Sequence, residues 1–583
     1  MEDPVVAAKV TPKVTPTQTS RYRARLVSRN KIEALIAEGR SIVIVDGVVL
    51  KVDPWLPYHP GGHKAILHMV GRDATDEVHA FHSAESQQMM LRYAIGRFEG
   101  RWKDFTPPIQ YGTFRTREEQ SAGATKQPLP VHVDLESASD SETSTRSPSL
   151  FDRAERSEGL RRRRGSAGAA SDSSATSLSD LELDEPAESF KQPSSAEEYV
   201  QQELLHDLDA YPSLDAATQS EITSKYRQLD QRIRDEKLYD CSYRAYAIEG
   251  VRYTALACLA YYTLQRGWYI PSAIFLGLFW HQLVFTVHDA GHMGITHDYH
   301  TDTCIGIGIA GFLGGLSCCW WKQNHNVHHI VTNSAEHDPD IQHMPFFAIS
   351  PRFFDSLKST YYDRIMTFDA VAKFTLKYQQ YLYYPILTMG RFNLYVLSWQ
   401  YIFLGQGPRK GPAWWHRYLE IAGQVFFWYW FGYLTVYKSI PTAGSRIAFV
   451  LISHMITAPV HVQITLSHFA MSTADLGVAE SFAQRMLRTT MDVDCPAWLD
   501  FVHGGLQFQA VHHLFPRIPR HNLRSCQKLV MKFCEDVEIP YAVYGFAEGN
   551  GKVLGRLGDV AKQARILAEC QRSIAVKDVF EGH

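Results

Sequence analysis

Histidines recur at short, regular spacings in the second half of the chain. They form three groups, here called box one (His288, His292), box two (His325, His328, His329) and box three (Gln509, His512, His513). At about 100° per residue, spacings of three and four place the members of a box on one face of a helix, so each box can aim two or three side chains at one point. Imidazoles without an equal number of carboxylates suit a first-row metal such as iron better than calcium or magnesium. The boxes therefore predict an iron site.

A second constellation lies near the N-terminus. His59 begins the motif His59-Pro60-Gly61-Gly62, and His82 follows later in Phe81-His82-Ser83. Two neutral imidazoles on opposite loops can ligate a haem iron from both faces, which leaves electron transfer as its function. Gly61 and Gly62 allow a tight turn beneath the porphyrin, and Pro60 precedes them. The alternative is that His59 is an ordinary loop histidine.

The elements around this pair indicate a small α+β domain. Ser28 precedes a helix over residues 31–37, and residues 42–52 are typical of two strands around an Asp46-Gly47 turn. We expect this domain to cover residues 20–105, after a disordered N-terminus at residues 1–19. Residues 106–195 are rich in Ser, Thr, acidic residues and Pro, and cannot bury enough apolar surface to fold. They are predicted to be a disordered linker.

Apolar runs long enough to cross a bilayer begin near residue 248. They cover residues 248–264, 268–287, 304–321, 381–405, 418–437 and 447–466. Residues 381–405 carry Arg391 at their middle, a costly residue at bilayer depth. All boxes must face the cytosol to meet the haem, so we expect four spans, at residues 248–264, 268–287, 418–437 and 447–466, while residues 304–321 dip without crossing. Residues 196–583 are thus predicted to form an all-α membrane domain with a cytosolic helical cap.

Composition narrows the choice of partners. The 59 Lys and Arg nearly balance the 62 Asp and Glu, giving a net charge of -3, so no nucleic acid partner is expected. The nine cysteines are scattered and form no CxxC pair, which argues against a disulfide framework. The N-terminus contains no apolar segment typical of a cleaved signal peptide, so the first domain is expected in the cytosol.

The stretch HPGGHKAILHMVGRDATDEVHAFHS resembles the cytochrome b5 family, over roughly residues 20 to 102. The resemblance implies that His59 and His82 are the axial haem ligands, and that His63, His68 and His79 are not. It also places four acidic residues around the haem edge, where they would steer a basic reductase or merely form a solvated face; they are Asp73, Asp76, Glu77 and Glu85.

The segments HDAGHMGITHDYH, WWKQNHNVHHIVTNSAEHDPDIQH and QFQAVHHLFPRIPRHN look like the membrane-bound di-iron desaturase superfamily, over residues 196 to 545. Gln509 in place of a histidine is typical of the cytochrome b5-fusion, or front-end, branch of this superfamily. The residues of the three boxes are most similar to those of fungal Δ8 sphingolipid desaturases. By position, the resemblance implies the di-iron ligands His288, His292, His325, His328, His329, His468, His512 and His513, with Gln509 beside them. His461, His503 and His521 match no ligand position. Asp338 and Asp340 are candidates to orient ligand imidazoles, or are plain turn residues.

This resemblance implies an O2-dependent desaturase with haem b and two non-haem irons. It would introduce a Δ8 double bond into the sphingoid base of a ceramide or other sphingolipid, as in glucosylceramide biosynthesis. Electrons would come from NADH-cytochrome b5 reductase through the chain's own haem, and the linker would let the haem domain visit both reductase and iron. The expected location is the endoplasmic reticulum membrane, as a multi-pass protein with the haem domain and boxes cytosolic.

Other functions remain open at this point. A front-end fatty-acyl desaturase has the same motifs and acts on another lipid, and a cytochrome b5-fused hydroxylase leaves oxygen in the product. A membrane electron carrier without iron, or a lipid-binding scaffold with neither metal, would leave the spacing of the boxes unexplained. The sequence gives neither the form of the sphingolipid nor the double-bond geometry.

Overall fold

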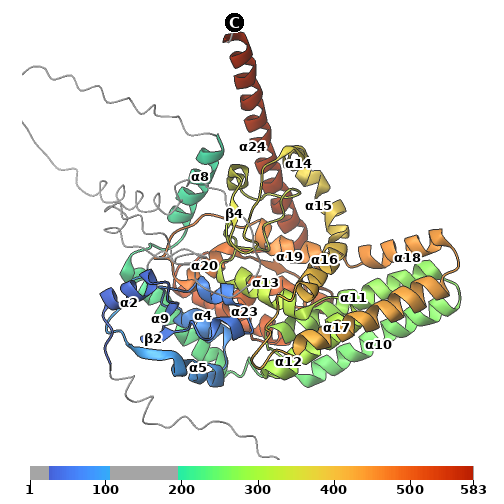
Figure 1. Ribbon diagram of the computed structural model, residues 1–583, viewed down its shortest axis with the longest axis horizontal. Helices are drawn as coiled ribbons and strands as arrows, with labels where there is room; N and C mark the ends of the chain where they lie inside the picture. Colours follow the sequence, from blue (N-terminus) through green and yellow to red (C-terminus); the bar gives the residue numbers. More distant parts are fainter. Residues whose placement is uncertain (1–24, 105–194, 582–583) are drawn as a thin grey trace, which may run out of the picture.

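The computed structural model describes residues 25–104 and 195–581. They form an N-terminal domain (residues 25–104) and a C-terminal domain (residues 195–581), packed against each other (Figure 1). The segments predicted to be a disordered N-terminus, residues 1–19, and a disordered linker, residues 106–195, lie almost wholly outside the described residues.

The N-terminal domain is the expected small α+β fold. Its antiparallel sheet runs in the order β1 (Ile42–Val45), β2 (Val48–Lys51) and β3 (Ala94–Arg97). Ser28 caps the first helix, accepting a hydrogen bond from the backbone N–H of Lys31, and Asp46 and Gly47 turn between the strands at φ values of 50° and 70°. The helical segments are α2 (Arg29–Ala37), η1 (Leu56–Tyr58), α3 (His63–Leu67), α4 (Thr75–Phe81), α5 (Ala84–Met90) and η2 (Leu91–Tyr93).

The C-terminal domain is almost wholly helical, with two minimal sheets. Antiparallel β4 (Lys358–Ser359) and β5 (Arg364–Ile365) form one, and parallel β6 (Asp492–Asp494) and β7 (Val543–Gly545) the other. The first helices are α8 (Ser195–Ala210), α9 (Ala216–Asp235), α10 (Tyr243–Gln265), α11 (Tyr269–Gly291), α12 (Tyr299–Ile307), η3 (Gly308–Leu313), α13 (Cys318–Ile330), η4 (Pro351–Asp355), α14 (Ala370–Thr375), η5 (Leu376–Tyr378), α15 (Gln379–Thr388) and α16 (Gly390–Phe403). The others are α17 (His416–Phe427), η6 (Trp428–Lys438), α18 (Ala443–Met455), α19 (Ala458–Phe469), α20 (Phe482–Thr489), η7 (Ala497–Leu499), α21 (Asp500–His503), η8 (Leu506–Phe508), α22 (Gln509–Leu514), η9 (Arg520–Asn522), α23 (Leu523–Asp536) and α24 (Phe546–Glu581).

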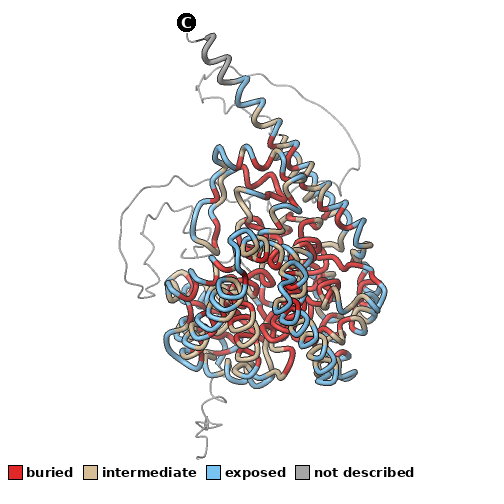
Figure 2. The backbone as a smooth tube through the Cα atoms, turned by 90° about the vertical axis from the view of Figure 1, so that its right-hand side faces the viewer, coloured by how far each residue is buried: buried red, intermediate tan, exposed pale blue. Residues whose placement is uncertain are grey.

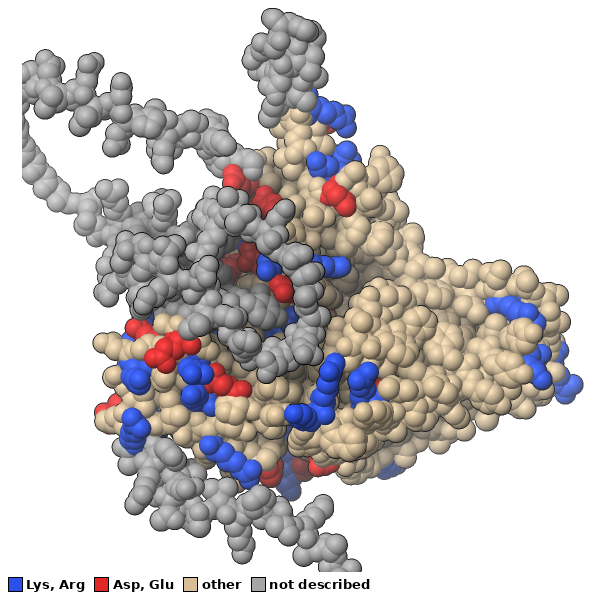
Figure 3. All heavy atoms as spheres, in the orientation of Figure 1, with Lys and Arg blue, Asp and Glu red and all other residues tan. Residues whose placement is uncertain are grey.

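A bundle made of α10, α11, α17 with η6, and α18 projects from the body (Figure 1). Its outer faces expose large apolar side chains, among them Val251 at 72%, Val425 at 67% and Ile447 at 61%. The face seen in Figure 3 carries almost no charge along the bundle until Lys and Arg side chains near its tip. Such a surface is unfavourable in water and suits lipid.

Within the described residues, two helical stretches are long and apolar enough to cross a membrane, Tyr269–Gly291 and Ala443–Phe469. They overlap two of the four predicted spans. The other two predicted spans correspond to α10, which carries Glu249 and Arg252, and to α17 continued by η6; both run in the projecting bundle.

The predicted dip over residues 304–321 coincides with a sharp break. Helix α12 with η3 meets α13 at a bend of 119°. Arg391 lies against this break, buried rather than facing lipid: its guanidinium donates to the Gly314 carbonyl at 2.7 Å and sits 4.2 Å above the Trp280 ring. The positive charge of Arg391 is thus stabilised by protein groups rather than exposed to lipid, which explains how this apolar segment contains an arginine.

Buried residues fill the centre of the body, and exposed ones lie on its periphery (Figure 2). One core cluster joins α9, α20, α22 and α23, where Tyr226 stacks on Phe515 at 5.3 Å. Another joins α15, α19 and α24 around Tyr383 and Phe469. Helix α22 is thus anchored in the first cluster and α19 in the second.

Candidate metal centre and haem site

The three boxes come from separate helices that meet in the body. His288 lies in the last turn of α11 and His292 directly follows the end of this helix. Box two occupies the second half of α13, and box three makes up most of the short helix α22. His468, near the C-terminal end of α19, joins them.

Their ring nitrogens converge into two adjacent groups. In each group, one nitrogen of every member lies within 4.8 Å of those of the others; the groups are His288, His292, His325 and His512, and His328, His468 and His513. His329 lies between them: its Nε2 is 3.2 Å from Nε2 of His325, and its ring stacks on His513 at 4.0 Å. All eight imidazoles expected as ligands therefore gather at one place.

Several of these ring nitrogens are left without a hydrogen-bond partner. Nε2 of His288, His292, His512 and His513 is buried and has no hydrogen-bond partner among the described residues. Leaving so many buried polar atoms unpaired is costly, and native structures avoid it. Convergent, unpaired imidazole nitrogens fit two neighbouring first-row metal ions, as the family resemblance requires.

The boxes are divided differently from the expectation that each aims at one point. Of these two imidazole groups, box one contributes both its histidines to one, whereas His512 and His513 of box three belong to different groups. His325 and His328 are also divided between the two, although both lie close enough to Asp340 to form a further possible ligand set with it. The physical reason is the helix geometry: adjacent residues diverge by about 100°, so one helix between two ions serves both.

Carboxylates orient the ring nitrogens of box two. Nδ1 of His328 donates to Asp338 at 2.8 Å, and Nδ1 of His325 lies 3.2 Å from Asp340. Asp338 is itself fixed by the backbone N–H of Asn333 at 2.7 Å. Such contacts set the tautomer and direction of a ligand imidazole. The expectation that Asp338 and Asp340 orient imidazoles thus agrees with these contacts.

Two further residues, which the sequence analysis did not identify, support the site. Thr332 lies 3.2 Å from Nδ1 of His513, and the Trp321 ring stacks on His325 at 4.5 Å. Gly291 is required for this stacking, because a Cβ there would collide with the Trp321 ring. In the sequence, the only sign of such a role is that each residue lies one helical turn from a histidine of box two. Other residues share this spacing, so it does not identify the two that contact the imidazoles.

Gln509 and the unmatched histidines have distinct places. Gln509 is the first residue of α22 and is buried, one turn before His512 and His513. His503 contacts Gln463 at 3.2 Å and His521 contacts Glu249 at 3.1 Å, away from both metal groups. Burial, followed by the charges of neighbouring histidines, lowers the pKa of His512 and of His513, so both stay neutral and able to bind metal.

His59 and His82 face each other across the N-terminal domain, with ring centres 6.1 Å apart. A metal–imidazole bond is about 2 Å long, so two rings on opposite sides of one iron have centres roughly 6 Å apart. Nδ1 of His59 donates to the Gly62 carbonyl at 2.8 Å and Nδ1 of His82 to the Val78 carbonyl at 3.1 Å, which leaves both Nε2 atoms for iron. Burial lowers the pKa of both, that of His82 to about 3.

Two of the other histidines of this domain, His79 and His68, have partners elsewhere. His79 pairs with Asp46 at 2.9 Å, and the His68 ring packs on His337 of the C-terminal domain at 5.4 Å. Gly62 has a φ of 86°, as the expected tight turn after Pro60 requires. The pair thus fits a haem with two axial histidines.

Two of the acidic residues expected to face a reductase are engaged within the chain. Asp76 pairs with Arg227 at 2.6 Å and Glu77 with Arg485 at 3.2 Å, both arginines belonging to the C-terminal domain. The reason is that the N-terminal domain docks through this acidic face, an arrangement that the sequence did not reveal.

Comparisons with known proteins agree with both constellations. The family described as "Fatty acid desaturase" matches residues 266–545, and "Cytochrome b5-like Heme/Steroid binding domain" matches residues 28–99. A "Delta 8-(E)-sphingolipid desaturase" of Emericella nidulans is 59% identical over 571 residues, covering 97% of this chain and 99% of the relative. A protein of the same name from Kluyveromyces lactis is 48% identical, covering 94% and 95%. A "Delta(8)-fatty-acid desaturase" of Helianthus annuus is 37% identical, covering 62% and 79%.

Family membership settles the class of enzyme and its cofactors. Desaturases of this kind are membrane oxidoreductases that use O2 and two irons, and a cytochrome b5 domain carries haem; both fit the histidine groups described above. The chain therefore belongs to the fatty acid desaturase family, in the branch whose members carry a fused cytochrome b5 domain.

Proposed function

We propose that the protein introduces a trans Δ8 double bond into the sphingoid base of a ceramide or related sphingolipid. The observation that carries this proposal is the convergence of eight imidazoles into two adjacent groups in a chain that also holds a paired-histidine haem site. The substrate class, the position and the geometry follow from the names of relatives that are 46% to 59% identical over nearly the full length.

The histidines of the three boxes and His468 are the proposed iron ligands, and His59 and His82 the proposed haem ligands. The two irons supply, with O2, the oxidising power needed to remove two hydrogens from an unactivated methylene pair. Asp338, Asp340 and Thr332 hold the imidazoles in place, and burial keeps bulk water away from them. The haem passes single electrons, and NADH-cytochrome b5 reductase is the proposed donor.

Expression in a host that lacks the activity, followed by lipid mass spectrometry with double-bond localisation, tests this function. The expected product is a sphingoid base that has lost two hydrogens, with the new bond at Δ8. A product that gained oxygen would identify a hydroxylase, and a double bond in the fatty-acyl chain would identify a front-end fatty-acyl desaturase.

Gln509→Ala is expected to lower turnover by roughly 10- to 100-fold, the usual cost of removing a group beside a metal site. The amide of Gln509 shares a short helix with His512 and His513 and can coordinate weakly or donate a hydrogen bond. Turnover per iron in purified enzyme is the measurement. Gln509→His retains more activity than Gln509→Ala if coordination is the role, and no more if the donor NH2 matters. Normal turnover and iron content in Gln509→Ala would exclude both roles.

We also propose that the protein lies in the endoplasmic reticulum membrane with the N-terminal domain and the boxes in the cytosol. The bend of 119° before α13 and the burial of Arg391 support a segment that returns to its own side. Glycosylation acceptor tags placed near Gln323 or near Arg391 should therefore remain unmodified, while a tag in the turn at residues 265–267 should be glycosylated. Modification at either of the first two sites contradicts the four-span topology.

A further inference from the structure

The N-terminal domain docks directly on α13, the helix that carries box two. The loop that follows His59 lies against this helix. A Cβ on Gly61 would lie 2.7 Å from Nδ2 of Asn326, and one on Gly62 would lie 3.4 Å from Gln323. Apolar residues of both domains, including Val45 and Val327, share one cluster beneath this contact. Thus α13 presents one face to the haem site and another to the metal groups.

The loop of the second haem histidine reaches the same helix through Phe81. The Phe81 ring meets the His329 ring edge-on, with centres 5.6 Å apart and planes at 83°. Phe81 is covalently joined to His82, and His329 lies between the two metal groups. A path from haem ligand to box histidine therefore contains a single non-covalent step. His68 and His337 also meet across the domain boundary, at 5.4 Å, but neither is a proposed ligand.

We propose that Phe81 is the positioning residue through which electrons pass from the haem to the iron centre, by way of His329. This inference rests on the proposed function. Each transfer oxidises the haem iron from ferrous to ferric and reduces one iron ion from ferric to ferrous. Two transfers, supplied by a flavin reductase that oxidises NADH, serve one double bond: the methylene pair, O2, two electrons and two protons give the alkene and two waters. The protein's contribution is the short, fixed approach of the two sites.

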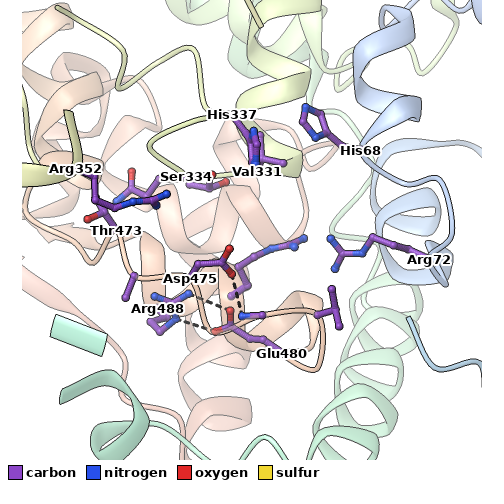
Figure 4. Close-up of a pocket in the computed structure, with 16 residues that line it drawn as sticks. His68, Arg72, Val331, Ser334, His337, Arg352, Thr473, Asp475, Glu480 and Arg488 are labelled. Carbon is purple, nitrogen blue, oxygen red and sulfur yellow. Dashed lines mark hydrogen bonds and ion pairs between the residues drawn. The ribbon is translucent and has the colours of Figure 1, made fainter. Parts of the chain in front are cut away.

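Ion pairs also join the two domains. Asp76 pairs with Arg227, whose side chain is half exposed, so salt weakens this pair, whereas the pair of Glu77 with Arg485 is largely buried. Beside them a cavity of about 80 Å³ is lined by His68 and Arg72 of the N-terminal domain and by Asp475 and Glu480 of the C-terminal domain (Figure 4). The N-terminal domain shares two apolar clusters with the C-terminal domain, one through Val45 and Val327 and one through Ala80 and Phe81. These contacts and the ion pairs are non-covalent, so the domain can leave to meet a reductase and return.

Haem re-oxidation in the full-length enzyme, loaded with haem and iron, tests Phe81. The haem is reduced by NADH and a trace of cytochrome b5 reductase, and stopped-flow absorbance then follows its re-oxidation in the presence of O2 and ceramide. Phe81→Leu and Phe81→Met, which keep bulk without an aromatic ring, should slow re-oxidation about tenfold or more. Phe81→Tyr should restore most of the rate. The haem spectrum, midpoint potential and rate of reduction should not change.

Phe98→Leu is the matched control, because Phe98 packs on Trp102 inside the N-terminal domain, at 4.9 Å, and not on α13. It should re-oxidise at the normal rate per haem. Normal rates in both Phe81→Leu and Phe81→Met overturn the proposal. So does loss of product when dithionite supplies electrons to the iron directly, since Phe81 would then be needed to build the site. If the haem of the unaltered enzyme is not re-oxidised by substrate turnover, the proposed function itself fails.

Discussion

His468→Ala is expected to abolish desaturation and to lower the iron content to about one ion per haem, while the haem spectrum stays normal. The His468 ring lies 4.5 Å from that of His328 and 4.9 Å from that of His513, in the group that contains only three imidazoles. Removing one of three nitrogens leaves too few ligands to retain an ion. Iron by elemental analysis, set against haem by absorbance, measures the effect in purified enzyme.

His461→Ala is the appropriate control for this variant. His461 lies on the same helix, two turns earlier, is partly buried, and belongs to neither metal group. A structural disturbance of α19 would therefore appear in both variants, and loss of a ligand only in His468→Ala. Full iron content in His468→Ala, or equal iron loss in His461→Ala, contradicts the ligand assignment.

The sequence predicted the parts of the site that depend on local spacing. Ligand residues on one helix recur every three or four positions, so the boxes could be found without a structure. The α+β fold of the N-terminal domain was predictable for a similar reason, since Ser28 and the Asp46-Gly47 turn are local signals that the structure reproduces. The family resemblance, confirmed by the comparisons, added His468, which no spacing rule connects to the boxes.

What the sequence could not supply depends on tertiary packing. The division of His512 and His513 between two groups follows from where α11, α13 and α19 stand around α22. Docking of the N-terminal domain on α13 is likewise invisible in the sequence, because Asp76 and Arg227 are ordinary surface charges until the domains meet. For this reason the sequence offered only a reductase or a solvated face as the role of these acids.

Arg391 has a structural role that its charge alone did not reveal. Its charge was taken to keep residues 381–405 out of the bilayer. In the structure the guanidinium is buried at the break before α13, donating to Gly314 and lying over Trp280. The residue therefore does more than avoid lipid: it holds the bent segment that brings box two under the N-terminal domain.

His82→Ala is expected to eliminate six-coordinate haem and product formation, with the iron content of the C-terminal domain unchanged. The two constellations have separate ligands, and His82 contributes no side chain to either metal group. The absorbance spectrum, iron analysis and lipid product measure the three consequences. His79→Ala, in the helix that ends just before His82 but paired with Asp46, should keep its haem. A six-coordinate spectrum in His82→Ala that is lost in His79→Ala would move the ligand from one residue to the other.

Added soluble cytochrome b5 should rescue His82→Ala only weakly. The haem-free domain still docks on α13 through Phe81, and on α9 and α20 through Asp76 and Glu77, at an effective concentration on the order of millimolar because it is tethered. It therefore competes with the added protein for the same surface. A chain that lacks the N-terminal domain should accept electrons from soluble cytochrome b5 better than the full-length His82→Ala chain does. Equal rescue of the two would mean that the docked position seen here does not block the route of electrons to the iron.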